Sequence, residues 1–143
     1  MLRRSPLNTS AARIGLRYGL FTGIGMTLYF TLLRFIWPTA PWDIQNLVFL
    51  VLGFGIIKGI QKFRQENKGR LTWLQGWGAG SMLSAVAGII YGLITLLIIF
   101  LYEPTGSEIH REAVGTFLFA IFYIVVVGGI FSLIASLFYQ KSN

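Results

Sequence analysis

The residues that could do acid–base or metal chemistry gather in one short stretch, SEIHRE, at 107–112. Glu108 and Glu112 are four residues apart and would share one face of a helix, where His110 could complete an acid–base or metal-binding group. One histidine without further partners is poor evidence for such a site. The alternative, which we favour, is a solvated helix start with Ser107 as N-cap and the acids at the positive end of the helix dipole.

Other common chemistries lack their residues. The chain has no cysteine, which excludes disulfides, thiolate metal sites and cysteine nucleophiles. The glycine-rich stretches GFGIIK at 53–58 and GWGAGS at 76–81 do not have the spacing of a phosphate-binding loop, and no strand precedes either. Apart from Arg17, Arg34 and Lys58, the apolar tracts contain no acidic or basic residue. We therefore expect no catalytic residue, metal or cofactor.

The elements that would position these residues are apolar tracts. Of the 143 residues, 55% are hydrophobic and 12% are charged, and the mean hydropathy is +0.67. Four tracts are long enough to cross about 30 Å of hydrocarbon as helices. They are continuously apolar, unlike the alternating strands of an outer-membrane barrel. We expect one all-α membrane domain over 1–143, with spans at about 19–37, 44–60, 78–102 and 113–138.

Basic residues alternate between the two sides of these spans. Four arginines precede the first span, a basic loop at 61–72 follows the second, and Lys141 follows the fourth. The other connections, 38–43 and 103–112, hold most of the acids. By the positive-inside rule, both termini and the basic loop lie in the cytoplasm and the other two loops lie outside. We expect a four-helix transmembrane bundle of two hairpins, N-in and C-in.

The basic run KGIQKFRQENKGR at 58–70 has a second interpretation, as a docking patch for anionic lipid headgroups or an acidic partner. Its basic residues are Lys58, Lys62, Arg64, Lys68 and Arg70. Any cytoplasmic loop between two spans of an inner-membrane protein has a similar composition. The net charge of +7 therefore indicates membrane topology rather than nucleic-acid binding.

Small residues recur at every fourth position in all four spans. In lipid, helices associate by close packing, and four-residue spacing keeps small side chains on one face. The positions are Gly15, Gly19, Gly23, Gly55, Gly59, Gly76, Gly80, Ser84, Gly88, Gly92, Gly128, Ser132 and Ser136. We predict that they face neighbouring helices in a tightly packed bundle. Because there are more stripes than one small bundle strictly requires, we also expect a homo-oligomer or a larger membrane complex.

Hydroxyl side chains inside the spans could instead line a narrow polar path. They are Thr22, Thr27, Thr31, Ser84, Thr95, Ser132 and Ser136. Such hydroxyls more often bond to a backbone carbonyl one turn back or across a helix pair. The small multidrug exporters also have four spans, but their pattern differs in having a carboxylate inside the first helix. The first span here, at 19–37, has none.

Three segments carry a likeness to a known family. GIIKGIQKFRQENKGRLTWLQGWGAGSMLSAVAGIIYG at 55–92 joins a span and basic loop to a helix that opens on spaced glycines, IIFLYEPT at 98–105 is an aromatic exit with a proline, and VVVGGIFSLIASLFYQK at 125–141 is a glycine-bearing helix with a basic tail. In these features the chain resembles the DUF4199 family of small bacterial inner-membrane proteins. The resemblance implies topology and compartment, while the function of that family is unknown.

These observations predict a non-enzymatic, multi-pass protein of the bacterial inner (cytoplasmic) membrane. We expect it to act by helix packing, as an accessory or assembly subunit of a larger membrane complex or as a homo-oligomer. Its expected partners are the lipid bilayer, anionic lipid headgroups at the cytoplasmic face and other membrane-protein subunits, with no nucleic acid. The alternatives are a small transporter or channel and, third, an enzyme dependent on His110 and Glu112.

Overall fold

The computed structural model describes residues 6–102 and 105–140, and their side chains except those of 6–10, 109 and 110. The described residues form four long helices and one single-turn helix, without strands. In chain order these are α1 (Pro6–Ile36), α2 (Trp42–Gln45), α3 (Val48–Glu66), α4 (Trp73–Tyr102) and α5 (Glu108–Tyr139). The predicted all-α class with four long helices is confirmed.

Each long helix contributes to a segment that is long and apolar enough to cross a membrane. These segments are Ala11–Ile36, Trp42–Glu66, Trp73–Tyr102 and Arg111–Tyr139. Only 17% to 33% of the most apolar part of each segment is buried inside the bundle, so most of its apolar surface faces outward. Apolar surface of this extent needs lipid around it. The chain is therefore a multi-pass membrane protein, as predicted.

The helices extend beyond the predicted spans at their polar ends. The prediction of a basic loop over 61–72 is wrong in its first half, because α3 continues through Glu66. The predicted outer loop 103–112 is likewise helical from Glu108 onward. Residues such as Lys62 and Gln65 are good helix formers, although they are too polar for hydrocarbon. Hydropathy therefore marks the part of a helix that suits lipid, not the whole helix.

Local sequence explains several helix ends. α1 stops just before Pro38, whose ring cannot continue a helix. α3 ends in a Schellman motif, in which the Gly69 N–H donates to the carbonyl of Arg64 at 2.9 Å. α4 begins with a capping box: the Gln75 N–H donates to Oγ1 of Thr72, and the Thr72 N–H donates to Oε1 of Gln75, both at 3.3 Å.

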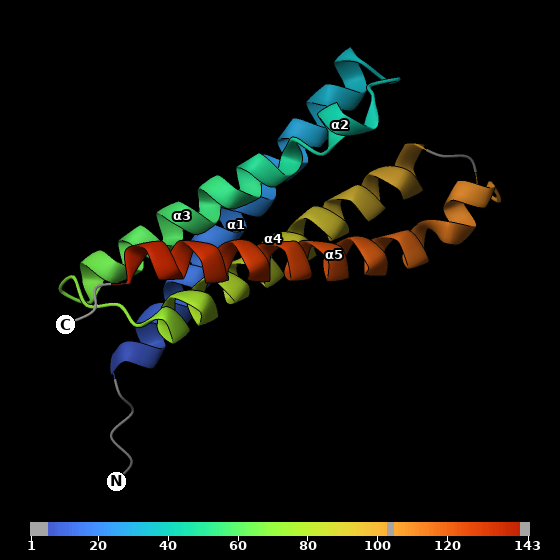
Figure 1. Cartoon of the computed structure of the whole chain (residues 1–143). Coiled ribbons are helices and arrows are strands. Elements are labelled where there is room, and N and C mark those ends of the chain that lie inside the picture. Colours follow the sequence, from blue (N-terminus) through green and yellow to red (C-terminus); the bar gives the residue numbers. More distant parts are fainter. Residues whose placement is uncertain (1–5, 103–104, 141–143) are drawn as a thin grey trace, which may run out of the picture.

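The helices form two hairpins, α1–α3 and α4–α5, that pack against each other (Figure 1). α4 is the central helix, since it makes the largest interfaces, with α5 and α1, and also touches α3. α1 and α4 run in one direction, while α3 and α5 run in the opposite direction. The start of α1 and the end of α5 lie at the same end of the bundle, and the two hairpins diverge toward the other end (Figure 1).

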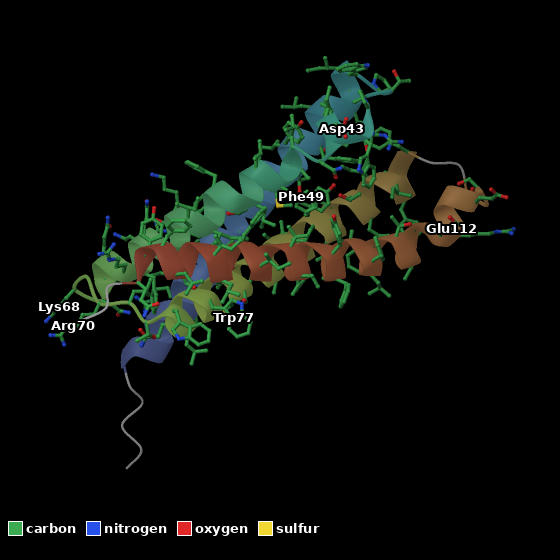
Figure 2. The ribbon with its side chains drawn as sticks, viewed as in Figure 1. Asp43, Phe49, Lys68, Arg70, Trp77 and Glu112 are labelled. Carbon is green, nitrogen blue, oxygen red and sulfur yellow. The ribbon has the colours of Figure 1, made fainter. Side chains whose placement is uncertain are left out.

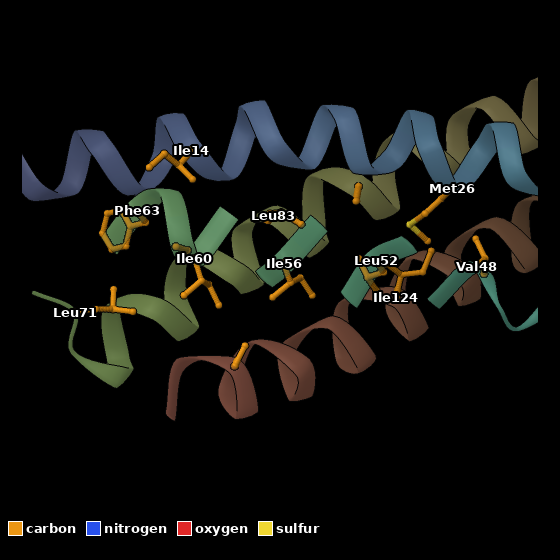
Figure 3. Packing of buried hydrophobic residues seen from close by; sticks show 13 residues of the cluster. Ile14, Met26, Val48, Leu52, Ile56, Ile60, Phe63, Leu71, Leu83 and Ile124 are labelled. Carbon is orange, nitrogen blue, oxygen red and sulfur yellow. The ribbon is translucent and has the colours of Figure 1, made fainter. Parts of the chain in front are cut away.

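The apolar core lies between the four long helices (Figure 3). α3 supplies its longest stripe, at three- and four-residue spacing, namely Val48, Leu52, Ile56, Ile60 and Phe63. Where the hairpins diverge, aromatic rings fill the wider space. Phe30 packs edge to face on Tyr91, and Phe49 on Tyr123, with ring centroids 5.9 and 5.4 Å apart.

Charged side chains divide between the two ends of the bundle. Lys68 and Arg70 lie at the end where α1 begins and α5 stops, which we call the basic end (Figure 2). Asp43 and Glu112 lie at the opposite end. This is the separation that the alternation of charges predicted. The assignment of the basic end to the cytoplasm stays a prediction.

Candidate functional site

The α4–α5 interface is a seam along which the small residues of α4 face small side chains of α5 near the basic end and larger ones toward the opposite end. The facing positions are Gly76 with Ser136, Gly80 with Ser132, Ser84 with Gly128, Gly88 with Ile124, and Gly92 with Phe117. Because the helices are antiparallel, each four-residue step along α4 from Gly76 to Gly88 corresponds to four residues back along α5. A Cβ added at Gly76 would lie 2.7 Å from the Cβ of Ser136, closer than such atoms can approach. The two backbones are therefore as close as small residues permit.

The α1–α4 interface uses a different pairing. Gly15, Gly19 and Gly23 form a stripe on α1, and they receive the bulky side chains of Met82, Val86 and Ile90 from a second face of α4. A Cβ added at Gly19 would lie 2.8 Å from the carbonyl oxygen of Leu83 and 2.7 Å from the Cβ of Val86. The glycine stripe on α1 thus accommodates bulky residues of α4, and the two helices run in parallel.

The two predicted positions of α3 face different helices. Gly55 lies against the side chain of Thr22 on α1, and Gly59 lies against Leu83 on α4, where an added Cβ would be 2.7 Å from Cδ1. α3 therefore occupies the space between α1 and α4. It therefore adds to the contact between the two hairpins that α1 and α4 make.

All thirteen predicted small positions are buried in one chain. The other glycines are all at least partly exposed, namely Gly25, Gly53, Gly69, Gly78, Gly106, Gly115 and Gly129. The structure thus brings the predicted residues together in the interior of one bundle and leaves none of them for a second copy. That these positions determine the stability of the bundle stays a prediction, argued in the Discussion.

Four buried hydroxyl groups donate to backbone carbonyls of their own helices. Thr27, Ser84 and Ser132 each donate to the carbonyl four residues earlier, at 2.8, 2.8 and 2.6 Å. Ser136 donates to the carbonyl of Leu133 at 2.8 Å. Hydroxyls bonded in this way do not present free donors to a permeating ion or solute. Their geometry is that of packing residues.

The five basic residues of the predicted docking patch lie on α3 and in the turn after it. Lys58, Lys62, Lys68 and Arg70 are exposed, whereas Arg64 is half-buried and its Nε donates to the carbonyl of Gly69 at 3.4 Å. Lys58 and Lys62 are four residues apart and share a face of α3. The Lys58 ammonium lies over the ring of Phe54, 5.5 Å from its centroid.

The SEIHRE segment forms the first turns of α5. The N–H of Arg111 donates to the carbonyl of Ser107 at 3.1 Å, which places Ser107 immediately before the helix. Glu108 and Glu112 are both exposed. The side chain of His110 lies outside the described residues. Among those that are described, no group of three or more His, Cys, Asp and Glu side chains could hold a metal ion.

An apolar groove between α3 and α5 was not foreseen from the sequence. Its volume is about 750 Å³, and its lining includes Phe49, Phe54, Phe131 and Phe138. Gly53 also lines it, and a Cβ added there would lie 3.9 Å from the ring of Phe131. The one sequence signal was that Gly53 lies outside the stripe formed by Gly55 and Gly59. A glycine outside the packing stripes is compatible with an open surface.

Three glycines of the α4–α5 hairpin face away from the rest of the chain. A Cβ added at Gly78, Gly115 or Gly129 would meet no atom within 4 Å. Glycine lowers the stability of a helix interior by about 1 kcal/mol relative to alanine. At these three positions its small size allows no close contact inside the bundle in return. These three positions lie outside the four-residue stripes that the sequence singled out.

Comparison with known proteins supports the resemblance. A family model described as a protein of unknown function (DUF4199) matches residues 15–116, which run from α1 into α5. The segment at 125–141 lies beyond the match. No curated protein and no solved structure matches the chain. Since the match covers more than half of the 143 residues, the chain belongs to the DUF4199 family, as the sequence predicted.

Proposed function

We propose that the protein is a non-enzymatic accessory or assembly subunit of a larger complex in the bacterial inner membrane. Its small-residue seams make the bundle a self-contained unit, and its outer surface is the part available to partners. In this role the protein holds other subunits together and catalyses no reaction.

The observation that carries this proposal is the outward orientation of Gly78, Gly115 and Gly129. In lipid there is little hydrophobic gain from joining two helices, so tight association depends on small residues that let backbones approach. Within this chain the three glycines allow no such approach, because nothing lies near them. A helix of another subunit could pack closely on the α4–α5 hairpin at these positions.

A small transporter or channel has less support. The buried hydroxyls Thr27, Ser84 and Ser132 bond to their own helices. A carrier or pore would need polar groups left free toward its path. We therefore retain the accessory role as the proposed function.

Removing the outward glycines tests the accessory role. Gly78→Leu combined with Gly129→Leu is expected to convert a larger, stoichiometric complex into free monomer, because bulk on the hairpin keeps a partner helix away. The measurement is the mass of the protein extracted from native membranes in mild detergent. The thermal stability of the purified monomer is expected to stay unchanged, since both positions face open space.

A matched control adds bulk to another lipid-facing surface. Leu28 on α1 is 57% exposed, and Leu28→Phe is expected to leave the complex intact. If the wild-type protein is strictly monomeric in mild detergent, or if the double glycine variant keeps its partner, the accessory role fails.

We further propose that the basic end faces the cytoplasm, because basic connections are retained on that side. Two single-cysteine variants, Lys68→Cys and Thr105→Cys, are treated in intact cells with a membrane-impermeant thiol reagent. The cysteine of Lys68→Cys is expected to be protected, and that of Thr105→Cys is expected to react. The opposite labelling pattern would reverse the orientation. The measurement is unambiguous because the natural chain has no cysteine.

A further inference from the structure

The α3–α5 groove opens on the outer surface of the bundle and has a volume of about 750 Å³, within the range typical of ligand sites. Its wall on α3 runs from Phe49 to Ile57 and its wall on α5 runs from Phe131 to Tyr139. Eight residues of helix correspond to roughly 12 Å, which is close to the depth of one leaflet of hydrocarbon. The groove therefore spans most of the depth of one leaflet.

The groove changes character toward the basic end. Most of its length is lined by aromatic and aliphatic side chains. At the basic end, Nε2 of Gln61 donates to the hydroxyl of Tyr139 at 2.6 Å. Lys58 lies three residues before Gln61 on α3, and its ammonium lies over the ring of Phe54 in the groove wall. The apolar groove thus has a positive charge on its α3 wall and a polar pair at one end.

Anionic phospholipids have the same order of chemical groups. An acyl chain can fill an apolar recess at membrane depth, and a phosphate can form an ion pair with an ammonium at the interface. A zwitterionic phospholipid has the same phosphate, but the cation of its headgroup offsets the attraction to Lys58, so a headgroup with net negative charge is preferred. Lys62 lies one turn further toward the basic end and adds to the same positive field.

We propose that this groove binds one anionic phospholipid, with an acyl chain between α3 and α5 and the phosphate at Lys58. Gly53 leaves the space that the chain occupies, and Lys58 selects the charge of the headgroup. The site lies on a different surface from the outward glycines of the α4–α5 hairpin. It does not depend on the accessory role.

Headgroup selection is tested with Lys58→Gln. The full-length protein is equilibrated with mixed micelles of phosphatidylglycerol and phosphatidylcholine, and retained lipids are counted by native mass spectrometry. The wild-type protein is expected to retain phosphatidylglycerol in preference to phosphatidylcholine. Lys58→Gln is expected to reduce that preference about fivefold, the effect of one basic residue near a membrane surface. The matched control is Lys68→Gln, which removes the same charge from the turn and is expected to leave the preference unchanged.

Acyl-chain binding is tested with Gly53→Leu, which fills the groove. The nearest atoms to an added Cβ are at ordinary contact distance, so the variant is expected to fold. It is expected to lose retained lipid of both headgroup types, while Leu28→Phe, which adds bulk at an exposed position of α1, retains it.

Three results would overturn the proposal. Equal losses with Lys58→Gln and Lys68→Gln would indicate only a diffuse surface charge. Full lipid retention by Gly53→Leu would place the lipid elsewhere. A wild-type dimer that Gly53→Leu converts into monomer would show that a second copy covers the groove.

Discussion

Replacing Gly19 with alanine is expected to lower the free energy of unfolding of the bundle by about 1–3 kcal/mol, the usual cost of overpacking. The added methyl group would lie 2.8 Å from the carbonyl oxygen of Leu83, a backbone atom that cannot rotate away, and 2.7 Å from the Cβ of Val86. α1 must therefore move away from α4. The measurement is reversible unfolding of the purified protein in detergent, and a larger substitution such as Gly19→Leu is expected to abolish folding.

The matched control is the same substitution at an outward glycine. Gly78→Ala adds a methyl group where no atom lies within 4 Å. Its effect is expected within about 0.5 kcal/mol of zero, or slightly stabilising because alanine is the better helix former. Similar losses at both positions would mean that glycine matters here for a reason other than helix contact.

The second large effect is expected at the α4–α5 seam and includes its own rescue. Gly128 faces Ser84 so closely that an added Cβ would overlap the serine side chain. Gly128→Ala alone is expected to cost about 1–3 kcal/mol. Adding Ser84→Gly empties the space on the opposite helix, so the double variant is expected to recover much of that loss.

A double-mutant cycle in the same unfolding assay measures this coupling. Residues in direct contact commonly show interaction energies of about 0.5–3 kcal/mol. Ser84→Gly alone removes a hydroxyl that bonds only to the carbonyl of Gly80, within its own helix, and leaves no buried donor unpaired. Additive losses in the double variant would show that Ser84 and Gly128 do not meet.

Four-residue spacing in the sequence picked out residues that are buried in the structure. It did not indicate which helices those residues bring together. Glycine at every fourth position of a membrane helix identifies a face that another backbone can approach. It carries no information on the partner, so nothing in the spacing indicated that Gly19 receives Val86 of α4 while Gly55 faces Thr22 of α1. Partner choice depends on the turns and the crossing of the helices, which are tertiary properties.

Other features were predicted incompletely for physical reasons. Hydropathy could not mark the end of α3 at Glu66, because polar residues form helices outside the lipid. The capping box of Thr72 and Gln75 was readable from the sequence and was missed. The α3–α5 groove depends on how two helices separate, and Gly53 alone does not specify that separation.

The burial of the stripes changes the case for a partner. The sequence suggested a second copy or another membrane protein because the stripes were numerous, yet all thirteen positions are buried inside one chain. The case now depends on Gly78, Gly115 and Gly129, which face open space. Substitutions inside the bundle should therefore impair folding, and substitutions on its surface should impair assembly.

The most direct test of the central claim, that the glycine face of α4 meets α5 of the same chain, is disulfide formation between Gly88→Cys and Ile124→Cys in intact membranes. A Cβ at Gly88 would lie 3.5 Å from the Cβ of Ile124, within the range of about 3.5–4.5 Å for disulfides. Because the natural chain has no cysteine, no other thiol competes. Oxidation of the double variant is predicted to give a monomer in which both thiols are consumed. The single variant Gly88→Cys is predicted to stay monomeric, with its thiol unreacted. A covalent dimer from Gly88→Cys, or two thiols that stay reactive in the double variant, would contradict the claim.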